Sequence, residues 1–221
     1  MSIHSDFWIE RYSSNVKYRN LFPYDHVVST IYYVFNRVSR PLNVLELGCG
    51  CGNNLLLFPR DVLGGGVGLD ISTDACNFAA ARDKHNRFSF ISHDLEILPY
   101  PIELNCIDLV IDRSSLSLFP KSTYSKIFHY LRDSITSPFY FYSNPYSDLH
   151  SSRPSSGPPV SNGPNSGAIN ASYAEYYSRN DILEIIDANI LDLRLINNTN
   201  FTDSIYSVES EWRCLAYVGG H

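Results

Sequence analysis

The sequence predicts an α/β fold built on one doubly wound sheet of seven strands, mostly parallel, with an antiparallel hairpin at the C-terminal edge. Three observations lead to this prediction. Short apolar runs alternate with amphipathic segments between residues 25 and 142, a glycine-rich turn follows the first run, and two strand-like runs succeed each other near the C-terminus. Strands that alternate with helices form a parallel sheet covered on both faces, with right-handed crossovers.

The predicted strands are short apolar runs bounded by turn residues. Six of them lie at residues 43–47, 88–92, 107–111, 139–142, 191–201 and 208–218. One more strand, second in chain order, ends at residue 70. Apolar spacing and capping residues predict helices over 25–39, 75–82, 121–131 and 181–188, with one more directly after the glycine turn. Ser72 is placed to cap the second of these, and Ser178 with Asp181 forms a capping box for the last. The two C-terminal strands have only a short polar connection, which permits an antiparallel hairpin and not a parallel crossover.

At 221 residues the chain is long enough for one large domain, and we expect a single domain over residues 1–221. Residues 1–40 are expected to form an N-terminal cover and a front helix. Residues 144–172 are rich in Pro, Gly, Ser and Asn and are too long for an ordinary connection. This segment leaves the fifth strand at its carboxyl end, where open parallel sheets bind ligands, so we expect a flexible, lid-like insert over an acceptor site.

Charge and composition disfavour several classes of partner. Lys and Arg number 17 against 23 Asp and Glu, a net charge of -6, so nucleic acid and anionic membranes are not expected partners. No apolar run approaches the roughly 20 residues of a membrane span. The five cysteines form no regular framework, which favours a cytoplasmic location. The pair Cys49-x-Cys51 lacks a second close pair of ligands, so no metal is expected. The sequence leaves the oligomeric state unknown.

The glycine turn is the first candidate for a ligand site. Gly48, Gly50 and Gly52 permit a tight turn and a close backbone approach to a ligand. The dinucleotide fingerprint is G-x-G-x-x-G, whereas here Asn53 stands at the place of its last glycine. Glu46 would repel a pyrophosphate and attract a cationic group. An NAD-dependent dehydrogenase or epimerase therefore remains the runner-up among enzymes.

Four motifs in order resemble the class I S-adenosylmethionine-dependent methyltransferases of the small-molecule type, which have a Rossmann-like sheet. The motifs are VLELGCGCGN at 44–53, GLDIS at 68–72, SHDL at 92–95 and DLVIDRSSL at 108–116. The resemblance spans residues 40–218. It implies transfer of a methyl group from S-adenosyl-L-methionine to a small polar metabolite, with S-adenosyl-L-homocysteine as the product. The arginines and tyrosines expected near the site favour an anionic or sugar-like acceptor.

The resemblance also implies roles for residues of this chain. Asp70 would accept the ribose hydroxyls, Asp94 the adenine amino group, and Glu46 with the Gly48 backbone would face the methionine moiety. The implied cofactor-binding residues are Glu46, Gly48, Cys49, Gly50, Gly52, Asn53, Asp70, Ile71, His93, Asp94, Leu95 and Asp112.

The acceptor side is less determined by the sequence. Weak catalytic candidates are His150, Asp112 and Arg113. Candidate substrate contacts, chosen for guanidinium and tyrosine chemistry near the same mouth, are Tyr12, Arg113, Tyr146, Arg153, Tyr177 and Arg179. By analogy with similar methyltransferases, Tyr12 and Tyr18 would close over the cofactor. The sequence leaves open whether O, N, C or S is methylated, and a general base is required mainly for a hydroxyl acceptor.

Two further alternatives stay open. Asn144-Pro145-Tyr146 invites comparison with the N-P-P-Y element of nucleic-acid base methyltransferases, although it lacks the second proline and follows the fifth strand instead of the fourth. A catalytically idle cofactor-binding scaffold is the alternative that is not an enzyme. Turnover on any acceptor would exclude the scaffold.

Overall fold

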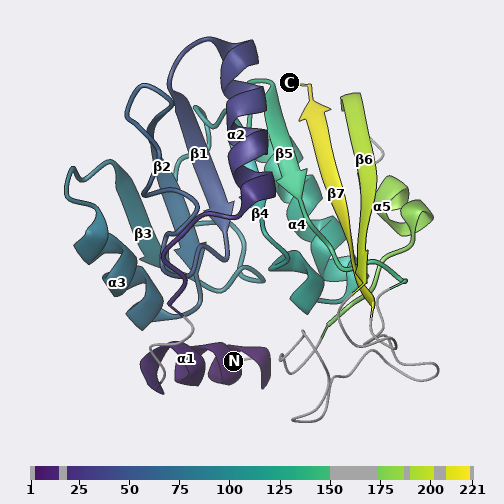
Figure 1. The fold of residues 1–221 in the computed structure, drawn as a ribbon, viewed down its shortest axis with the longest axis horizontal. Coiled ribbons are helices and arrows are strands. Elements are labelled where there is room, and N and C mark those ends of the chain that lie inside the picture. Colours follow the sequence, from purple (N-terminus) through teal and green to yellow (C-terminus); the bar gives the residue numbers. More distant parts are fainter. Residues whose placement is uncertain (1–2, 15–18, 150–173, 187–189, 202–207, 220–221) are drawn as a thin grey trace.

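The computed structural model describes residues 3–14, 19–149, 174–186, 190–201 and 208–219. One mixed sheet runs through the molecule in the order β3-β2-β1-β4-β5-β7-β6 (Figure 1). Its strands are β1 Leu42–Leu47, β2 Leu63–Asp70, β3 Phe88–Ser92, β4 Leu109–Asp112, β5 Phe139–Ser143, β6 Ile190–Phe201 and β7 Val208–Val218. β1 to β5 pair in parallel, and β7 is antiparallel to both β5 and β6. The predicted mostly parallel sheet with a C-terminal antiparallel pair is confirmed.

Helices occupy most of the segments where they were expected. They are α1 Ile3–Ser14, α2 Asp25–Val38, α3 Thr73–Arg82, α4 Lys121–Ser134 and α5 Arg179–Ile185, with a 3-10 turn at Leu116–Leu118. The Ser72 side chain accepts the backbone N–H of Ala75 and caps α3 as predicted. Both halves of the capping box between Ser178 and Asp181 are present at α5. α5 nevertheless begins before the predicted residue 181 and ends at Ile185, short of the predicted residue 188.

The helix expected directly after the glycine turn is wrong. Residues 51–57 form a run of turns, in which Leu55 and Leu56 both donate to the carbonyl of Gly52. Asn54 uses its side chain instead to bind Glu46 and the backbone N–H of Tyr24, which anchors the segment to β1 and to the start of α2. Side chains that bond to nearby polar groups in this way compete with a helix.

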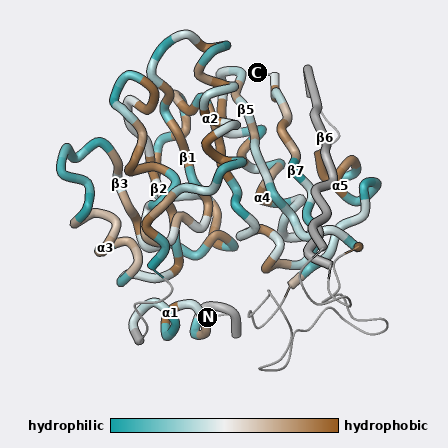
Figure 2. The backbone as a smooth tube through the Cα atoms, viewed as in Figure 1, coloured by the Kyte–Doolittle hydropathy of each residue, from teal (hydrophilic) through white to brown (hydrophobic). Residues whose placement is uncertain are grey.

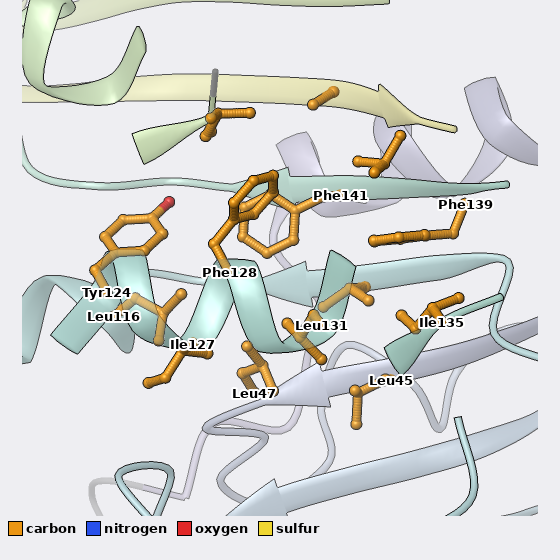
Figure 3. Close-up of a cluster of buried hydrophobic side chains, with 14 of the residues drawn as sticks. Leu45, Leu47, Leu116, Tyr124, Ile127, Phe128, Leu131, Ile135, Phe139 and Phe141 are labelled. Carbon is orange, nitrogen blue, oxygen red and sulfur yellow. The ribbon is translucent and has the colours of Figure 1, made fainter. Parts of the chain in front are cut away.

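β1 divides its side chains between two hydrophobic cores. Val44 faces the core beneath α2, whereas Leu45 and Leu47 face the core beneath α4 and α5. This alternation follows from the period of two along a strand. Figure 3 shows side chains of α4 pointing at β5, where the Phe128 and Phe141 rings pack edge to face at 5.1 Å. The hydrophobic stretches in Figure 2 accordingly concentrate in the strands and helices rather than in the outer loops.

The carboxyl ends of the parallel strands form the edge at which a ligand is expected. Figure 1 shows α1 lying beyond these ends, away from the C-terminal end of β7. Most of the predicted insert at 144–172 lies outside the described residues. Within the described part of the chain, no helix is both long and apolar enough to cross a membrane.

Candidate cofactor-binding site

A cavity of about 300 Å³ lies at the carboxyl ends of the central strands, beneath α1. Most of the predicted cofactor-binding residues line it: Glu46, Gly48, Cys49, Gly50, Asn53, Asp70, Ile71, Asp94 and Leu95. They come from the ends of β1 and β2 and from the turn after β3. The first three sequence motifs therefore meet at one cavity, although they are separated along the chain.

The glycine turn comes close to the residues opposite it. Gly48 and Gly50 have φ angles of 66° and 50°, in the left-handed region that favours glycine. A Cβ atom on Gly48 would overlap the Ser115 side chain, and one on Gly50 would lie 2.6 Å from the Tyr12 hydroxyl. The bare backbone thus forms part of the cavity wall. Gly52 differs, because its missing Cβ would meet Phe90, and the structure does not place it on the cavity.

Asp70 anchors this turn. One carboxylate oxygen accepts the backbone N–H of Gly50 at 2.8 Å, and the other accepts that of Ser72 at 2.9 Å. Burial raises the pKa of Asp70, and the two backbone hydrogen bonds oppose that rise. Each carboxylate oxygen can accept a second hydrogen bond, so Asp70 can hold the turn and still accept donors from a ligand.

Glu46 is a buried carboxylate with one oxygen that accepts no hydrogen bond from the described residues. Its side chain is 1% exposed, and Oε1 accepts from the Asn54 amide at 2.6 Å. Oε2 has no hydrogen-bond partner among the described residues. Burial raises the pKa of Glu46 to about 8, even though the Asn54 hydrogen bond opposes this. A cationic ligand group at Oε2 would relieve the cost of a buried, half-satisfied acid.

Asp112 and His93 do not line the cavity. The Asp112 carboxylate points into the protein, where it accepts the Leu116 backbone N–H at 2.9 Å and the Ser143 hydroxyl at 2.6 Å. Burial raises the pKa of Asp112 to about 6, and these hydrogen bonds oppose the rise. The His93 ring lies 2.8 Å from the Ile97 carbonyl oxygen. Both side chains are therefore engaged within the fold.

Some of the residues predicted to contact the acceptor line the cavity and others do not. Tyr12, Arg113 and Tyr146 line the cavity. Tyr177 does not, because it is fully buried against Tyr124, with the two ring centroids 5.5 Å apart. Arg179 is exposed at the start of α5, away from the cavity. Tyr18, His150 and Arg153 lie outside the described residues.

Several cavity residues were not predicted from the sequence. They are Trp8, Arg11, Asn20, Tyr24, Cys51, Asn54, Ser114, Ser115, Leu118 and Phe119. Asn54 directly follows the glycine motif, so extending that motif by one residue would have included it. The two serines follow Arg113 within the fourth motif and were part of that motif without being named as site residues. No local pattern marked Trp8, Arg11 or Tyr24, which reach the cavity only through the tertiary position of α1 and the start of α2.

Asn144 forms hydrogen bonds within the fold and does not line the cavity. Its side-chain amide donates to the Trp212 backbone carbonyl at 2.8 Å, and its backbone carbonyl accepts the Ser114 hydroxyl at 2.6 Å. The comparison with N-P-P-Y therefore gains no support from the geometry. Among the described residues, no group of three or more His, Cys, Asp or Glu could hold a metal ion.

Comparisons with known proteins agree with this geometry. Residues 44–136 match a family model described as a methyltransferase domain. A search of curated proteins finds no match. A magnesium protoporphyrin IX methyltransferase from Synechocystis with bound SAM is 14% identical, with a TM-score of 0.67, and 99% of each chain is covered. The N-methyltransferase NodS from Bradyrhizobium japonicum, in complex with S-adenosyl-L-homocysteine, is 12% identical, with a TM-score of 0.65, covering 97% of this chain and 98% of that one.

Residues 44–136 match a methyltransferase domain, and the doubly wound sheet with its glycine turn is the fold of the class I S-adenosylmethionine-dependent methyltransferases. The cofactor of this methyltransferase domain is S-adenosyl-L-methionine. The chain fits this cofactor on two observations. Glu46 Oε2 is an unpartnered acceptor beside the glycine turn, and the turn forms a surface that a Cβ atom would obstruct.

Proposed function

We propose that this enzyme transfers the methyl group of S-adenosyl-L-methionine to a small polar molecule bound in the same cavity. The observation that carries the proposal is the buried, unpartnered Glu46 Oε2 at the glycine turn, within a cavity of about 300 Å³. A cavity of this size, closed in part by α1, suits small molecules. Two of the similar structures are a magnesium protoporphyrin IX methyltransferase and an N-methyltransferase, which supports a small-molecule acceptor.

Each end of the cofactor finds residues of suitable chemistry. We assign the cofactor's ammonium group to Glu46, its ribose hydroxyls to Asp70 and its adenine amino group to Asp94, because each carboxylate lines the cavity and can accept hydrogen bonds. Ile71 and Leu95 offer apolar contact to the adenine. The backbone of Gly48 and Gly50 permits a close approach without a side chain in the way.

The bound cofactor supplies a methyl group activated by its sulfonium, so the protein's own residues mainly bind, orient and exclude water. Trp8 and Tyr12 of α1 line the cavity, where their side chains can limit the access of water. Among the described residues, no histidine lines the cavity. An acceptor that needs little help to lose its proton, such as an amine or an already ionised group, suits this lining best.

Ligand binding tests the cofactor step first. S-Adenosyl-L-homocysteine should raise the melting temperature and give saturable heats in calorimetry, whereas NAD should do neither, because a native-state ligand stabilises by mass action. The acceptor step is tested by mass spectrometry of copurifying small molecules, followed by a search for S-adenosyl-L-homocysteine release over a metabolite library. Stabilisation by NAD alone would contradict the assignment. Cofactor binding with no turnover on any acceptor would favour an idle scaffold.

We also propose a cytoplasmic location for the enzyme. All five cysteines are free, four of them buried, as is usual for proteins of a reducing compartment.

A further inference from the structure

The charged residues of the cavity are sorted by sheet position. Asp94 follows β3, Asp70 ends β2 and Glu46 lies in β1, so three carboxylates occupy the half of the cavity over β3, β2 and β1. Arg113 follows β4 and Tyr146 follows β5, so a cation and an aromatic ring occupy the other half. Along the edge of the sheet, the cavity is therefore acidic at one end and cationic and aromatic at the other, and Arg11 of α1 adds a second cation to its lining.

Arg113 is poised to bind an anion. Its Nε atom is buried without a hydrogen-bond partner, and its guanidinium makes no ion pair with any described residue. The guanidinium instead stacks over the Tyr24 ring, with Cζ 3.8 Å from the centroid. Stacking fixes the plane of the guanidinium while its N–H edges stay available for a forked pair with a carboxylate or phosphate. A buried donor left unpaired is costly, so a ligand that satisfied it would gain affinity.

The surroundings of Arg113 are flat and apolar. Tyr24, Phe119 and Tyr146 line the same cavity as Arg113. Tyr146 and Trp8 of α1 both pack against a small hydrophobic cluster of Ala174 and Tyr176. Aromatic walls beside a guanidinium suit a ligand with a planar apolar body and an anionic group.

We propose that Arg113, at the β4–β5 end of the cavity, binds a carboxylate or phosphate group of the acceptor. This inference rests on the proposed function, since it concerns the second substrate of the same reaction. The cofactor is cationic at its sulfonium and ammonium groups, which match the acidic end, so the cationic end is left for an anionic partner. The competing ligand for Arg113 is the cofactor's own carboxylate, and the test below separates the two.

The test observes Arg113 directly in protein labelled with ¹⁵N-arginine and saturated with S-adenosyl-L-homocysteine. The Nε–H signal of Arg113 is assigned by its loss in Arg113→Lys. Benzoate and phenyl phosphate are the two anionic probes, and benzamide is the uncharged probe of the same shape. We expect one or both anions to shift the signal saturably and benzamide to leave it unchanged. An equal response to all three probes, or a response to none, overturns the proposal.

A matched pair of variants adds a second arm. Arg113→Met should weaken binding of the responding anion by about tenfold or more, since a charged hydrogen-bonded pair is lost. Arg37→Met is the control, because Arg37 also stacks on a tyrosine, Cζ lying 3.5 Å from the Tyr33 centroid, but does so on the exposed side of α2 away from the cavity. It should bind the anion as the unmodified protein does. Arg113→Gln replaces Arg113→Met if the latter fails to fold, and the probe comparison needs no variant.

Calorimetry with S-adenosyl-L-homocysteine distinguishes the two ligands that compete for Arg113. Arg113→Met should retain cofactor affinity within about threefold if the residue serves the acceptor. A loss of about tenfold or more would assign Arg113 to the cofactor's carboxylate and overturn the proposal. Failure of the unmodified protein to bind S-adenosyl-L-homocysteine would instead contradict the proposed function itself.

Discussion

The Asp70 carboxylate and the Gly50 backbone N–H are joined by a 2.8 Å hydrogen bond, which ties the end of β2 to the glycine turn after β1. The same carboxylate accepts from Ser72, the residue that caps α3. One side chain thus fixes the turn and the start of the next helix while it lines the cavity. A substitution here changes the shape of the site as well as its charge.

We predict that Asp70→Ala weakens binding of S-adenosyl-L-methionine by about 2 kcal/mol or more, because charged acceptors for ligand and turn are both lost. Asp70→Asn should have a smaller effect, since its amide oxygen still accepts one hydrogen bond. Calorimetry with the cofactor or its product measures both variants. Unchanged affinity in both, in folded protein, would show that the second motif is not part of the cofactor site.

Gly50 should tolerate no side chain. Gly50→Val places a branched residue at a φ of 50° and pushes its Cβ against the Tyr12 hydroxyl, so we expect cofactor binding to be lost. Gly50→Ala carries the backbone cost of roughly 1–2 kcal/mol with less steric conflict. Adding Tyr12→Phe to Gly50→Ala removes the hydroxyl in conflict and should restore part of the affinity in calorimetry. A folded Gly50→Val protein that binds normally would contradict this account of the turn.

Glu46 should make stability and binding depend on pH in opposite ways. Its pKa is raised from 4.5 to about 8 in the folded protein, so the native state binds an extra proton between these values. The contribution of Glu46 to the free energy of unfolding of the ligand-free protein should therefore fall as pH rises from about 4.5 to 8 and then level off. Affinity for the cofactor should rise over the upper part of this range, since the ionised carboxylate attracts the ammonium group.

Glu46→Gln is the control for this pH dependence. It keeps the shape and cannot ionise, so chemical denaturation across the pH range should show a shallower slope than in the unmodified protein. Asp112 and Asp70, whose pKa values burial also raises, contribute to the slope that remains, and His26, whose pKa burial lowers, opposes it. Identical pH profiles for the two proteins would refute the assignment of the slope to Glu46.

Asp112 should act on stability rather than on cofactor affinity. Asp112→Asn disturbs acceptance from both the Leu116 backbone and the Ser143 hydroxyl in a fully buried place. We expect a loss of about 1–3 kcal/mol in the free energy of unfolding. Cofactor affinity should change little, since the side chain does not line the cavity. A large loss of affinity in a variant of normal stability would return Asp112 to the cofactor site.

Strands and capped helices were predictable because local patterns specify them. The apolar run before Gly48 specified β1, and the Ser72 and Ser178 caps marked the starts of α3 and α5. The expected helix after the glycine turn failed because Asn54 bonds to Glu46, a contact made across the turn that no propensity reveals. The end of α4 was predicted less well than its start, because the helix begins at Lys121 as predicted but continues to Ser134, beyond the predicted residue 131.

The site residues also divide into those that local sequence patterns predict and those that depend on tertiary contacts. Carboxylates at strand ends, such as Asp70 and Asp94, could be placed because the carboxyl ends of parallel strands share one edge. Asp112 occupies an equivalent position in sequence but points the other way, because Ser143 and Leu116 offer it hydrogen bonds within the core. No sequence pattern marks Tyr24 as a site residue. It lines the cavity only because of the tertiary position of the start of α2.

Because β7 lies between β5 and β6, the two halves of the cavity are completed at different times during synthesis. β1, β2 and β3, which carry the acidic end, are complete before the chain reaches residue 100. The aromatic end depends on β7, since the Trp212 backbone N–H donates to Pro145 next to Tyr146 and its indole donates to the Tyr177 carbonyl. Contacts this distant along the chain form slowly. A nascent chain can therefore form the acidic half of the cavity before the aromatic half is complete.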